Sequence, residues 1–260
     1  MDALSEERAP LEAVRLSVRA GTRELVRDLT VAFARAEVVA ILGRNGSGKT
    51  LTLHTLAGLR RPDAGEVTLG GTPIGTLARR EVALRLGVLP QDLEEAFVTT
   101  ALESVLIGRH PHLKLWQWES VEDERLAREA LAAVDLQDFA TRRSNTLSGG
   151  EQRRLAVASL LAQQPKVFLL DEPTNHLDPH HQLAVLKVFR ALKETGRTVI
   201  TTLHDATLAA RFADRVLLLF GDGRWSLGPV RDLSAAALSE LYLAPIMELN
   251  QDGRRVFVSA

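Results

Sequence analysis

The chain has 260 residues, 45% of them hydrophobic and 25% charged, so it can bury a sizeable core. Its formal net charge of −1 does not support a mainly electrostatic nucleic-acid binder. The absence of cysteine excludes disulfides, thiolate metal sites and a cysteine nucleophile, and we expect neither a secretory signal nor a membrane span.

The N-terminal region is predicted to be rich in strands. Alternation of Val14, Leu16 and Val18 predicts a half-buried strand, and a second begins at Leu29.

A buried strand is predicted from the apolar run at 37–42, because it is short and ends in a glycine. It leads into a loop and a helix that ends near Gly58, a plausible C-cap. A hairpin that turns at Gly70 and Gly71 follows, and residues 86–90 predict another strand.

A helical insert is expected at about 92–148. Thr100 with Glu103 forms a capping-box pattern, and Ser120 with Asp123 forms a weaker one. Apolar residues then recur at helical spacing between 126 and 134.

Helices alternate with strands after the insert. We expect helices at 149–163, 180–194 and 206–213, and strands at 166–171, 198–203 and 215–220. This alternation predicts a mostly parallel sheet with crossover helices. The tail, about 230–260, predicts a helix and a small hairpin that turns at Asp252 and Gly253. We expect one domain over 1–260.

A phosphate-binding loop is predicted where the buried strand meets the helix. The sequence GRNGSGKT fits G-x-x-x-x-G-K-[ST], in which backbone amides and a helix N-terminus surround phosphates. Its lysine would reach the β- and γ-phosphates, and its threonine would ligate Mg²⁺. The candidate residues are Gly43, Arg44, Asn45, Gly46, Ser47, Gly48, Lys49 and Thr50.

The stretch VFLLDE supplies an acidic partner for this loop. A buried strand ends in Asp171 and Glu172. We expect Asp171 to hold Mg²⁺ and Glu172 to polarise the attacking water. Alone, an apolar strand that ends in two acids is as typical of a simple strand-to-loop edge as of a catalytic site. Together with the phosphate loop, it favours the catalytic site.

The sequence LSGGE at 147–151 resembles the signature of ABC-type ATPases, and other motifs match in order over about 11–230. Gln91 lies where the family has its Q-loop glutamine, and His204 lies where the family has its switch histidine. The stretch at 175–178 resembles the family's D-loop. The resemblance implies an α/β P-loop NTPase with a mostly parallel central sheet, an N-terminal antiparallel β subdomain and a helical insert. It also implies an ATPase that uses Mg²⁺ and dimerises head to tail.

Two of these residues have physically reasonable roles in hydrolysis. Gln91 is neutral and flexible, which suits contact with Mg²⁺ and the lytic water. The imidazole of His204 would hydrogen-bond the γ-phosphate. In isolation, such a glutamine is usually a solvated loop residue, and such a histidine more often neighbours a helix cap. The surrounding motifs favour the catalytic interpretation.

We interpret the signature as half of a site that a second copy completes. Ser148, Gly149 and Gly150 precede an apolar-periodic helix, so hydroxyl, amides and helix N-terminus form an anion receptor. Without a lysine, it would bind phosphate poorly alone. It therefore suits a γ-phosphate already held by a partner's phosphate loop.

Adenine recognition departs from the family pattern. Ala20 stands where the family commonly has an aromatic residue that stacks on adenine. Stacking is either absent or supplied by the guanidinium of Arg19 or Arg23. We expect reduced selectivity among nucleoside triphosphates.

Transport and soluble ABC functions remain the competing classes. One motif set, no heptad run and no cysteine favour a transporter subunit over a soluble ATPase of cofactor assembly or translation. Residues 105–113 resemble the G-R-x-P-H stretch of importer ATPases for iron–siderophores, haem and cobalamin. We expect this stretch to break the helix and form a loop that faces a membrane partner.

Trp116 and Trp118 follow this stretch and either anchor the coupling surface or pack within the insert. His110 and His112 lack nearby acids and make a weak metal site, and the D-loop explains the histidines at 176, 180 and 181 better than a metal does. The expected partners are a second copy, polytopic permease subunits and, indirectly, a periplasmic or surface substrate-binding protein, with no nucleic acid. The expected location is the cytoplasmic face of the plasma membrane.

Overall fold

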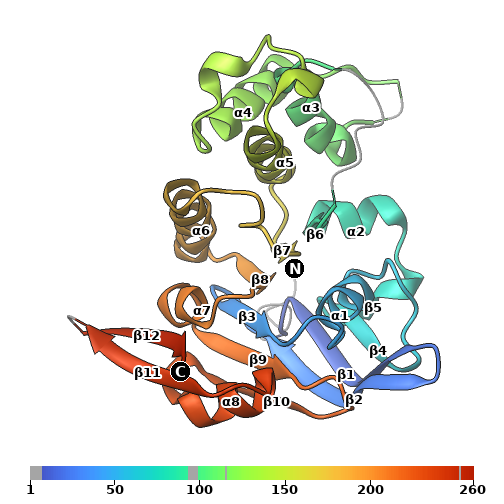
Figure 1. Ribbon diagram of the computed structural model, residues 1–260. Coiled ribbons are helices and arrows are strands. Elements are labelled where there is room, and N and C mark those ends of the chain that lie inside the picture. Colours follow the sequence, from blue (N-terminus) through green and yellow to red (C-terminus); the bar gives the residue numbers. More distant parts are fainter. Residues whose placement is uncertain (1–7, 93–98, 115, 252) are drawn as a thin grey trace.

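The computed structural model describes residues 8–92, 99–114, 116–251 and 253–260. Figure 1 shows strands at one end of the molecule and a layer of helices at the other. The antiparallel sheet has the order β2-β1-β4-β5, the central sheet β10-β9-β3-β8-β7-β6, and the hairpin β11-β12 stands at the C-terminus. The N-terminal antiparallel sheet expected from the sequence is confirmed.

The antiparallel sheet is built from the N-terminal strands and the predicted hairpin. Its strands are β1 (Leu11–Ala20), β2 (Arg23–Phe33), β4 (Ala64–Leu69) and β5 (Thr72–Pro73). Leu69 pairs with Thr72 across the turn, so the hairpin is where the glycine pair predicted it.

The alternation predicted for β1 is wrong at Val14, which is 36% exposed. Leu11 and Ala13 are buried before it, and Leu16 and Val18 after it. The buried face changes phase because the register shifts between Ala13 and Leu16, where Arg15 has a φ of 47°. Such a bulge inserts a residue, so a strict period of two cannot cross it.

The central sheet is parallel except at one edge. Its strands are β3 (Val38–Leu42), β6 (Leu86–Leu89), β7 (Val167–Leu170), β8 (Thr198–Thr202), β9 (Arg215–Leu219) and β10 (Trp225–Pro229). β10 pairs antiparallel with β9 and was not foreseen, because its residues are only partly buried and lack an apolar run. The mostly parallel sheet predicted from helix–strand alternation is otherwise confirmed.

The central strands are buried on both faces, which explains their continuous apolar runs. In β3, Val39 and Ile41 join the core between the two sheets, to which Leu53 and Leu56 of α1 (Lys49–Leu56) contribute. The other face of β3 packs into the core that holds the remaining helices. On the sheet side, these helices are α6 (Pro179–Glu194) and α7 (Ala206–Phe212). The helix α2 (Arg79–Arg85), which was not foreseen, instead packs Val82 against the core between the two sheets.

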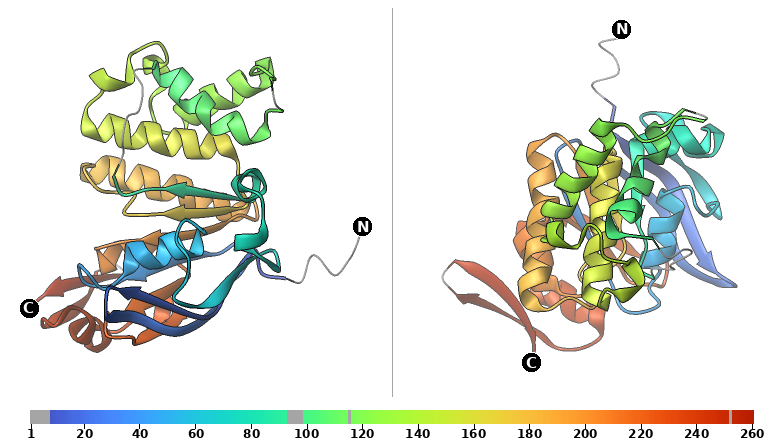
Figure 2. Two further views of the ribbon diagram at one scale, coloured as in Figure 1. Left: turned by 90° about the vertical axis from the view of Figure 1, so that its right-hand side faces the viewer. Right: turned by 90° about the horizontal axis from the view of Figure 1, so that it is seen from above.

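The helical layer consists of α3 (Ala101–Leu106), α4 (Val121–Ala132) and α5 (Gly149–Gln163). Figure 2 shows these helices stacked at the end of the molecule opposite the antiparallel sheet. Capping boxes begin each helix, at Thr100, Ser120 and Ser148, and α5 has the predicted bounds. Part of the predicted insert, residues 93–98 and 115, lies outside the described residues.

The loop expected at 105–113 is a short 3-10 helix, Ile107–His112, that packs on α5. A Cβ on Gly108 would lie 2.2 Å from the carbonyl oxygen of Ser159, so only glycine allows this approach. Arg109 is buried and bonds Asp123 at 2.9 Å and the carbonyl of Ala162 at 2.7 Å. The predicted helix break is present, since α3 ends at Leu106, but a 3-10 helix replaces the expected loop because glycine and arginine fix this segment to the helical layer.

The C-terminal region contains α8 (Ala235–Tyr242) and an antiparallel pair, β11 (Ile246–Gln251) with β12 (Arg254–Ser259). The predicted helix and hairpin are both present, although Asp252 of the turn lies outside the described residues. Among the residues described, no helix is long and apolar enough to cross a membrane.

Because of the bulge in β1, we expect substitutions of two nearby apolar residues, Leu16 and Val14, to change the free energy of unfolding by very different amounts. Leu16→Ala should lower the free energy of unfolding by about 2–5 kcal/mol, because Leu16 is fully buried. Val14→Ala should change it by no more than about 0.5 kcal/mol, because Val14 is exposed. Urea denaturation followed by circular dichroism measures both; equal losses would contradict the change of phase.

Candidate nucleotide-binding site

The phosphate loop joins β3 to α1, as the sequence predicted. Gly46 and Gly48 have φ angles of 74° and 99°, which only glycine adopts without strain, and Gly48 is the N-cap of α1. Lys49 is 5% exposed and its Nζ donates to the carbonyl oxygens of Gly43 at 2.8 Å and Arg44 at 3.3 Å. The lysine thus lies along its own loop, next to the positive end of a helix.

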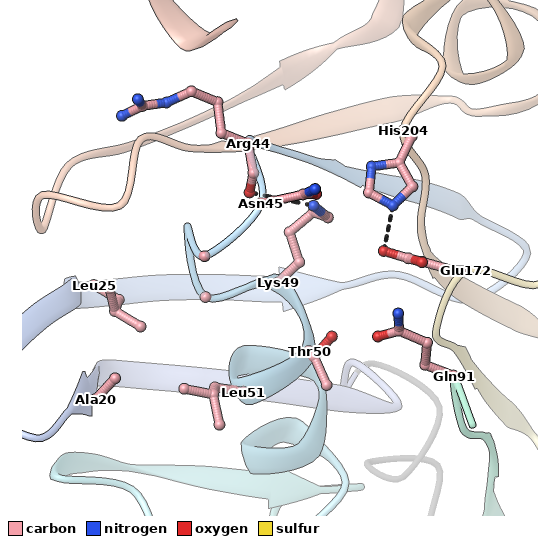
Figure 3. A pocket seen from close by; sticks show the side chains of 12 residues that line it. Ala20, Leu25, Arg44, Asn45, Lys49, Thr50, Leu51, Gln91, Glu172 and His204 are labelled. Atoms are coloured by element: carbon pink, nitrogen blue, oxygen red, sulfur yellow. Dashed lines mark hydrogen bonds and ion pairs between the residues drawn. The ribbon is translucent and has the colours of Figure 1, made fainter. Parts of the chain in front are cut away.

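A cavity of about 490 Å³ opens against this loop. Figure 3 shows Lys49, Thr50, Gln91, Glu172 and His204 around a common space. The structure therefore brings together the phosphate loop, the Q-loop glutamine, the second acid and the switch histidine from four separate parts of the chain. The lining residues are Ala20, Leu25, Arg44, Asn45, Gly46, Gly48, Lys49, Thr50, Leu51, Gln91, Glu172 and His204.

The two acids follow β7 and are held by the neighbouring strand. Asp171 is completely buried, and its Oδ1 accepts a hydrogen bond from the hydroxyl of Thr202 at 2.7 Å. The backbone N–H of Glu172 donates to the same hydroxyl oxygen at 2.8 Å. A single side chain at the end of β8 thus fixes both acids.

The carboxylate of Glu172 is 7% exposed and contacts two polar side chains. Nε2 of His204 lies against Oε1, and the amide of Asn175 donates to Oε2. The backbone of Glu172 has a φ of 49°, an uncommon conformation for a residue with a Cβ. The structure therefore presents this carboxylate in a fixed orientation at the cavity wall.

Electrostatics in the cavity favour an anionic ligand. Burial lowers the pKa of Lys49, while the carboxylates of Glu172 and Asp171 act in the opposite direction. Desolvation disfavours the charged ammonium. Phosphate oxygens beside it would stabilise that charge, so nucleotide binding would favour the protonated lysine.

The oxygen atoms around the cavity fit a magnesium ion. Oδ2 of Asp171 is buried without a hydrogen-bond partner among the described residues, which is costly unless a further group occupies the site. Thr50 and Gln91 line the cavity and carry a hydroxyl and an amide oxygen, whereas Asp171 lies behind Glu172 and is not a lining residue. Hard oxygen ligands of this kind are those that Mg²⁺ prefers, usually together with phosphate and water.

The signature residues lie outside this cavity. Ser148 and Gly149 are exposed at the N-terminus of α5 and Gly150 is partly exposed; none lines the cavity. The hydroxyl oxygen of Ser148 accepts a hydrogen bond from the N–H of Glu151 at 3.3 Å, and Glu151 bonds back to the N–H of Ser148 at 2.7 Å. One chain therefore holds a phosphate loop and, separately, an open helix N-terminus.

The end of the cavity beyond the phosphate loop is aliphatic. Ala20, Leu25 and Leu51 line it, with no aromatic side chain among the lining residues. Neither Arg19 nor Arg23 lines it; the guanidinium of Arg23 donates to the carbonyl of Gly221 at 2.7 and 3.1 Å. The geometry thus gives no support to guanidinium stacking on a base.

Sequence reasoning missed several residues that hold the site. Asn175 was recognised only as part of the D-loop motif, and Thr202 and Arg153 only as members of a strand and a helix. The hydroxyl of Tyr242, whose pKa burial raises to about 12, donates to the carbonyl of His204 at 3.2 Å. A sequence signal for Thr202 was available. It is a threonine at the end of a buried strand, and the neighbouring strand ends in two acids.

The only candidate metal cluster of His, Asp and Glu side chains found in the described part of the chain lies at the start of α6. Ligand atoms of Asp178, His180 and His181 lie within 4.8 Å of one another. Asp178 is the N-cap of α6, and its carboxylate accepts hydrogen bonds from the backbone N–H and ring of His181 at 2.9 and 2.8 Å. Helix capping accounts for this arrangement.

A phosphate loop followed by a helix, an acidic strand end and a mostly parallel sheet define a P-loop ATPase. The ABC transporter family model matches residues 26–175. The chain therefore belongs to the ABC transporter family, as an ATP-hydrolysing cassette.

Relatives and solved structures agree on the family. The chain is 40% identical to the hemin import ATP-binding protein of Gloeobacter violaceus, over 86% of this chain and 82% of that protein. It is 36% identical to the petrobactin import ATP-binding protein of Bacillus anthracis, over 80% of this chain and 77% of that protein.

An inward-facing transporter described as of metal-chelate type matches with a TM-score of 0.83 and 27% identity, over 96% of this chain and 97% of that one. A bacterial ABC transporter cassette solved as a dimer matches with a TM-score of 0.73 and 28% identity, over 86% and 100%.

The aliphatic end of the cavity predicts weak discrimination between bases. Stacking of any base on an aromatic ring contributes about 1–3 kcal/mol, and the lining residues include no Phe, Tyr or Trp. The apolar side chains of Ala20, Leu25 and Leu51 also offer no hydrogen bond that distinguishes one base from another. The kcat/KM values for ATP, GTP and CTP should therefore agree within about tenfold. Ala20→Tyr should restore a stacking surface and tighten nucleotide binding. A preference of wild type for ATP above tenfold would contradict this interpretation.

Proposed function

We propose that the chain is the ATP-hydrolysing subunit that energises import of a metal chelate, an iron–siderophore, haem or cobalamin, through a membrane ABC transporter. The observation that carries this proposal is the match to the metal-chelate type transporter, which extends over 96% of the chain and so includes the helical layer. The relatives' import of hemin and petrobactin agrees with this class of cargo.

Hydrolysis takes place in the cavity at the phosphate loop. Lys49 and the loop amides hold the β- and γ-phosphates, and the remaining loop residues keep those amides in place. Thr50, Asp171 and Gln91 would hold Mg²⁺, which would neutralise phosphate charge. Glu172 orients and polarises the attacking water. His204, whose imidazole lies beside the carboxylate of Glu172, contacts the γ-phosphate.

Two copies of the chain complete two shared sites. The N-terminus of α5, with Ser148, Gly149 and Gly150, is exposed and lies outside its own chain's cavity, so it is available to a second copy. Its amides and helix dipole suit a γ-phosphate that the opposite phosphate loop already holds. The dimeric cassette among the similar structures supports this arrangement.

The helical layer couples the dimer to polytopic permease subunits, which receive cargo from a periplasmic or surface binding protein. Trp116 and Trp118 are 92% and 86% exposed, so they do not pack within the insert. Large exposed aromatics are typical anchors of protein interfaces. The chain acts as one ATPase domain over 1–260, with its helical subdomain at about 92–148 and the tail at about 230–260. It works peripherally at the cytoplasmic face of the plasma membrane.

Replacement of the proposed base should trap the closed state. Glu172→Gln keeps the size of the side chain but cannot polarise water, so ATP turnover should fall about 100-fold or more while ATP still binds. The variant should then form an ATP-dependent dimer, measured by size-exclusion chromatography with light scattering. Full turnover in this variant would overturn the assignment of Glu172.

The Ser148→Arg variant separates the two half-sites. It should bind ATP through its intact phosphate loop, yet neither hydrolyse it nor dimerise, because an added guanidinium blocks the anion receptor. Adding Ser148→Arg to Glu172→Gln should abolish the ATP-dependent dimer. Persistence of that dimer would show that it forms by another surface.

Membrane association tests the transporter class. In native cells, the protein should sediment with membranes, and a double Trp116→Ala, Trp118→Ala variant should shift to the soluble fraction while ATP binding is unchanged. Met247→Ala is a matched control, since Met247 is a 48% exposed apolar residue on the C-terminal hairpin. A wild-type protein wholly in the soluble fraction would favour a soluble ABC ATPase instead.

A further inference from the structure

Two neighbouring arginines in α5 are buried and have different partners. Arg153 is 2% exposed and Arg154 is 8% exposed. Arg154 donates to the carbonyl oxygens of Val134 and Asp135 at 2.9 and 3.2 Å, both within the helical layer. Arg153 instead reaches out of that layer, to the nucleotide site.

The guanidinium of Arg153 bonds backbone carbonyls on two segments of the nucleotide site. One terminal nitrogen donates to the carbonyl oxygens of Pro90 at 2.5 Å and Gln91 at 3.2 Å. The other donates to those of Asp171 at 2.5 Å and Glu172 at 2.8 Å. One side chain therefore joins the signature helix to the ends of β6 and β7.

These carbonyls belong to the residues whose side chains must be aligned for hydrolysis. Glu172 has a φ of 49°, and such a conformation persists only where surrounding contacts fix it. Its N–H is held by Thr202 and its C=O by Arg153. The N–H of Asn175 donates to the same carbonyl oxygen at 3.1 Å, so Arg153 is one of three contacts to the N–H and C=O of Glu172.

The interaction depends on the shape of a guanidinium. Arginine presents a planar fork of donors, whereas lysine offers a single ammonium. The burial of Arg153 lowers its pKa to about 10, with Asp171 and Glu172 acting in the opposite direction. The group therefore stays charged near neutral pH, and its bonds to carbonyls are charge-assisted.

We propose that Arg153 is a positioning residue for ATP hydrolysis, which keeps Glu172 and Gln91 aligned with each other and with the signature helix. Because α5 carries the exposed signature at its N-terminus, Arg153 also transmits any movement of that helix to the carbonyl groups at the ends of β6 and β7. The inference rests on the proposed roles of Glu172 and Gln91 in hydrolysis.

The adjacent arginine provides a matched control. Arg153→Gln should lower kcat about 10- to 100-fold, the loss expected from a small misplacement of a reacting group. The KM for ATP should stay within about twofold, because the phosphate loop is untouched. Arg154→Gln should lower the melting temperature comparably, since it also leaves buried carbonyls unpaired, but should keep the kcat of the folded protein. Arg153→Lys should recover part of the lost kcat, because an ammonium still donates to some of the carbonyls.

Single-turnover hydrolysis in a Glu172→Gln background completes the test. If Arg153 acts by aligning Glu172, then Arg153→Gln should slow that variant much less than it slows wild type. Equal loss of kcat in the Arg153→Gln and Arg154→Gln variants, or unchanged kcat in folded Arg153→Gln, would overturn the proposal. An active Glu172→Gln variant would instead refute the proposed role of Glu172. If the Glu172→Gln variant is inactive and the Arg153→Gln variant keeps the kcat of wild type, only the role of Arg153 is refuted.

Discussion

The buried carboxylate of Glu172 is the constraint on which the arrangement of the site depends. A carboxylate at 7% exposure is stable only with polar partners, and these come from separate segments of the chain, His204 and Asn175. They can meet because β3, β8 and β7 are adjacent and parallel, so their carboxyl ends lie at one edge of the sheet. The phosphate loop, Thr202 and the acids all follow these strands. Ligand sites at this edge are the general rule for open parallel sheets.

Charge balance supports the proposal that a second chain completes the site. Lys49 and Arg153 face Asp171 and Glu172 in the buried region, so cations and anions are nearly matched before nucleotide binds. A triphosphate adds several negative charges, which the loop amides and the N-terminus of α1 offset only in part. In the proposed mechanism, a Mg²⁺ ion beside the orphaned oxygen of Asp171 would supply another part. The positive N-terminus of a second copy's α5 would supply the rest.

The sequence predicted elements that local patterns determine. Strands such as β3 and β7 are buried on both faces and read as apolar runs, and capping-box patterns marked the starts of α3 and α4. The predictions failed where distant contacts decide the geometry. The bulge at Arg15 is one case, and the packing of Gly108 against Ser159 is another.

The same distinction applies to the site. Its phosphate loop, Gln91, Glu172 and His204 were found from motifs, and the structure places them around one cavity, although their roles in hydrolysis remain predictions. Thr202, Asn175 and Arg153 carry no motif that assigns them a role in the site. Their importance comes from pairing across strands and helices, which spacing along one sequence does not reveal.

The helix α5 connects all the parts that must respond to ATP. Its 15 residues span about 22 Å. Its N-terminus is exposed for a second copy, Arg153 contacts the catalytic backbone of its own chain, and Ser159 packs on Gly108 beside the segment that leads to the exposed tryptophans. A rigid helix held at these three places cannot tilt at one without moving the others. Closure on a partner's nucleotide would therefore reach the permease-facing segment directly, without a separate relay.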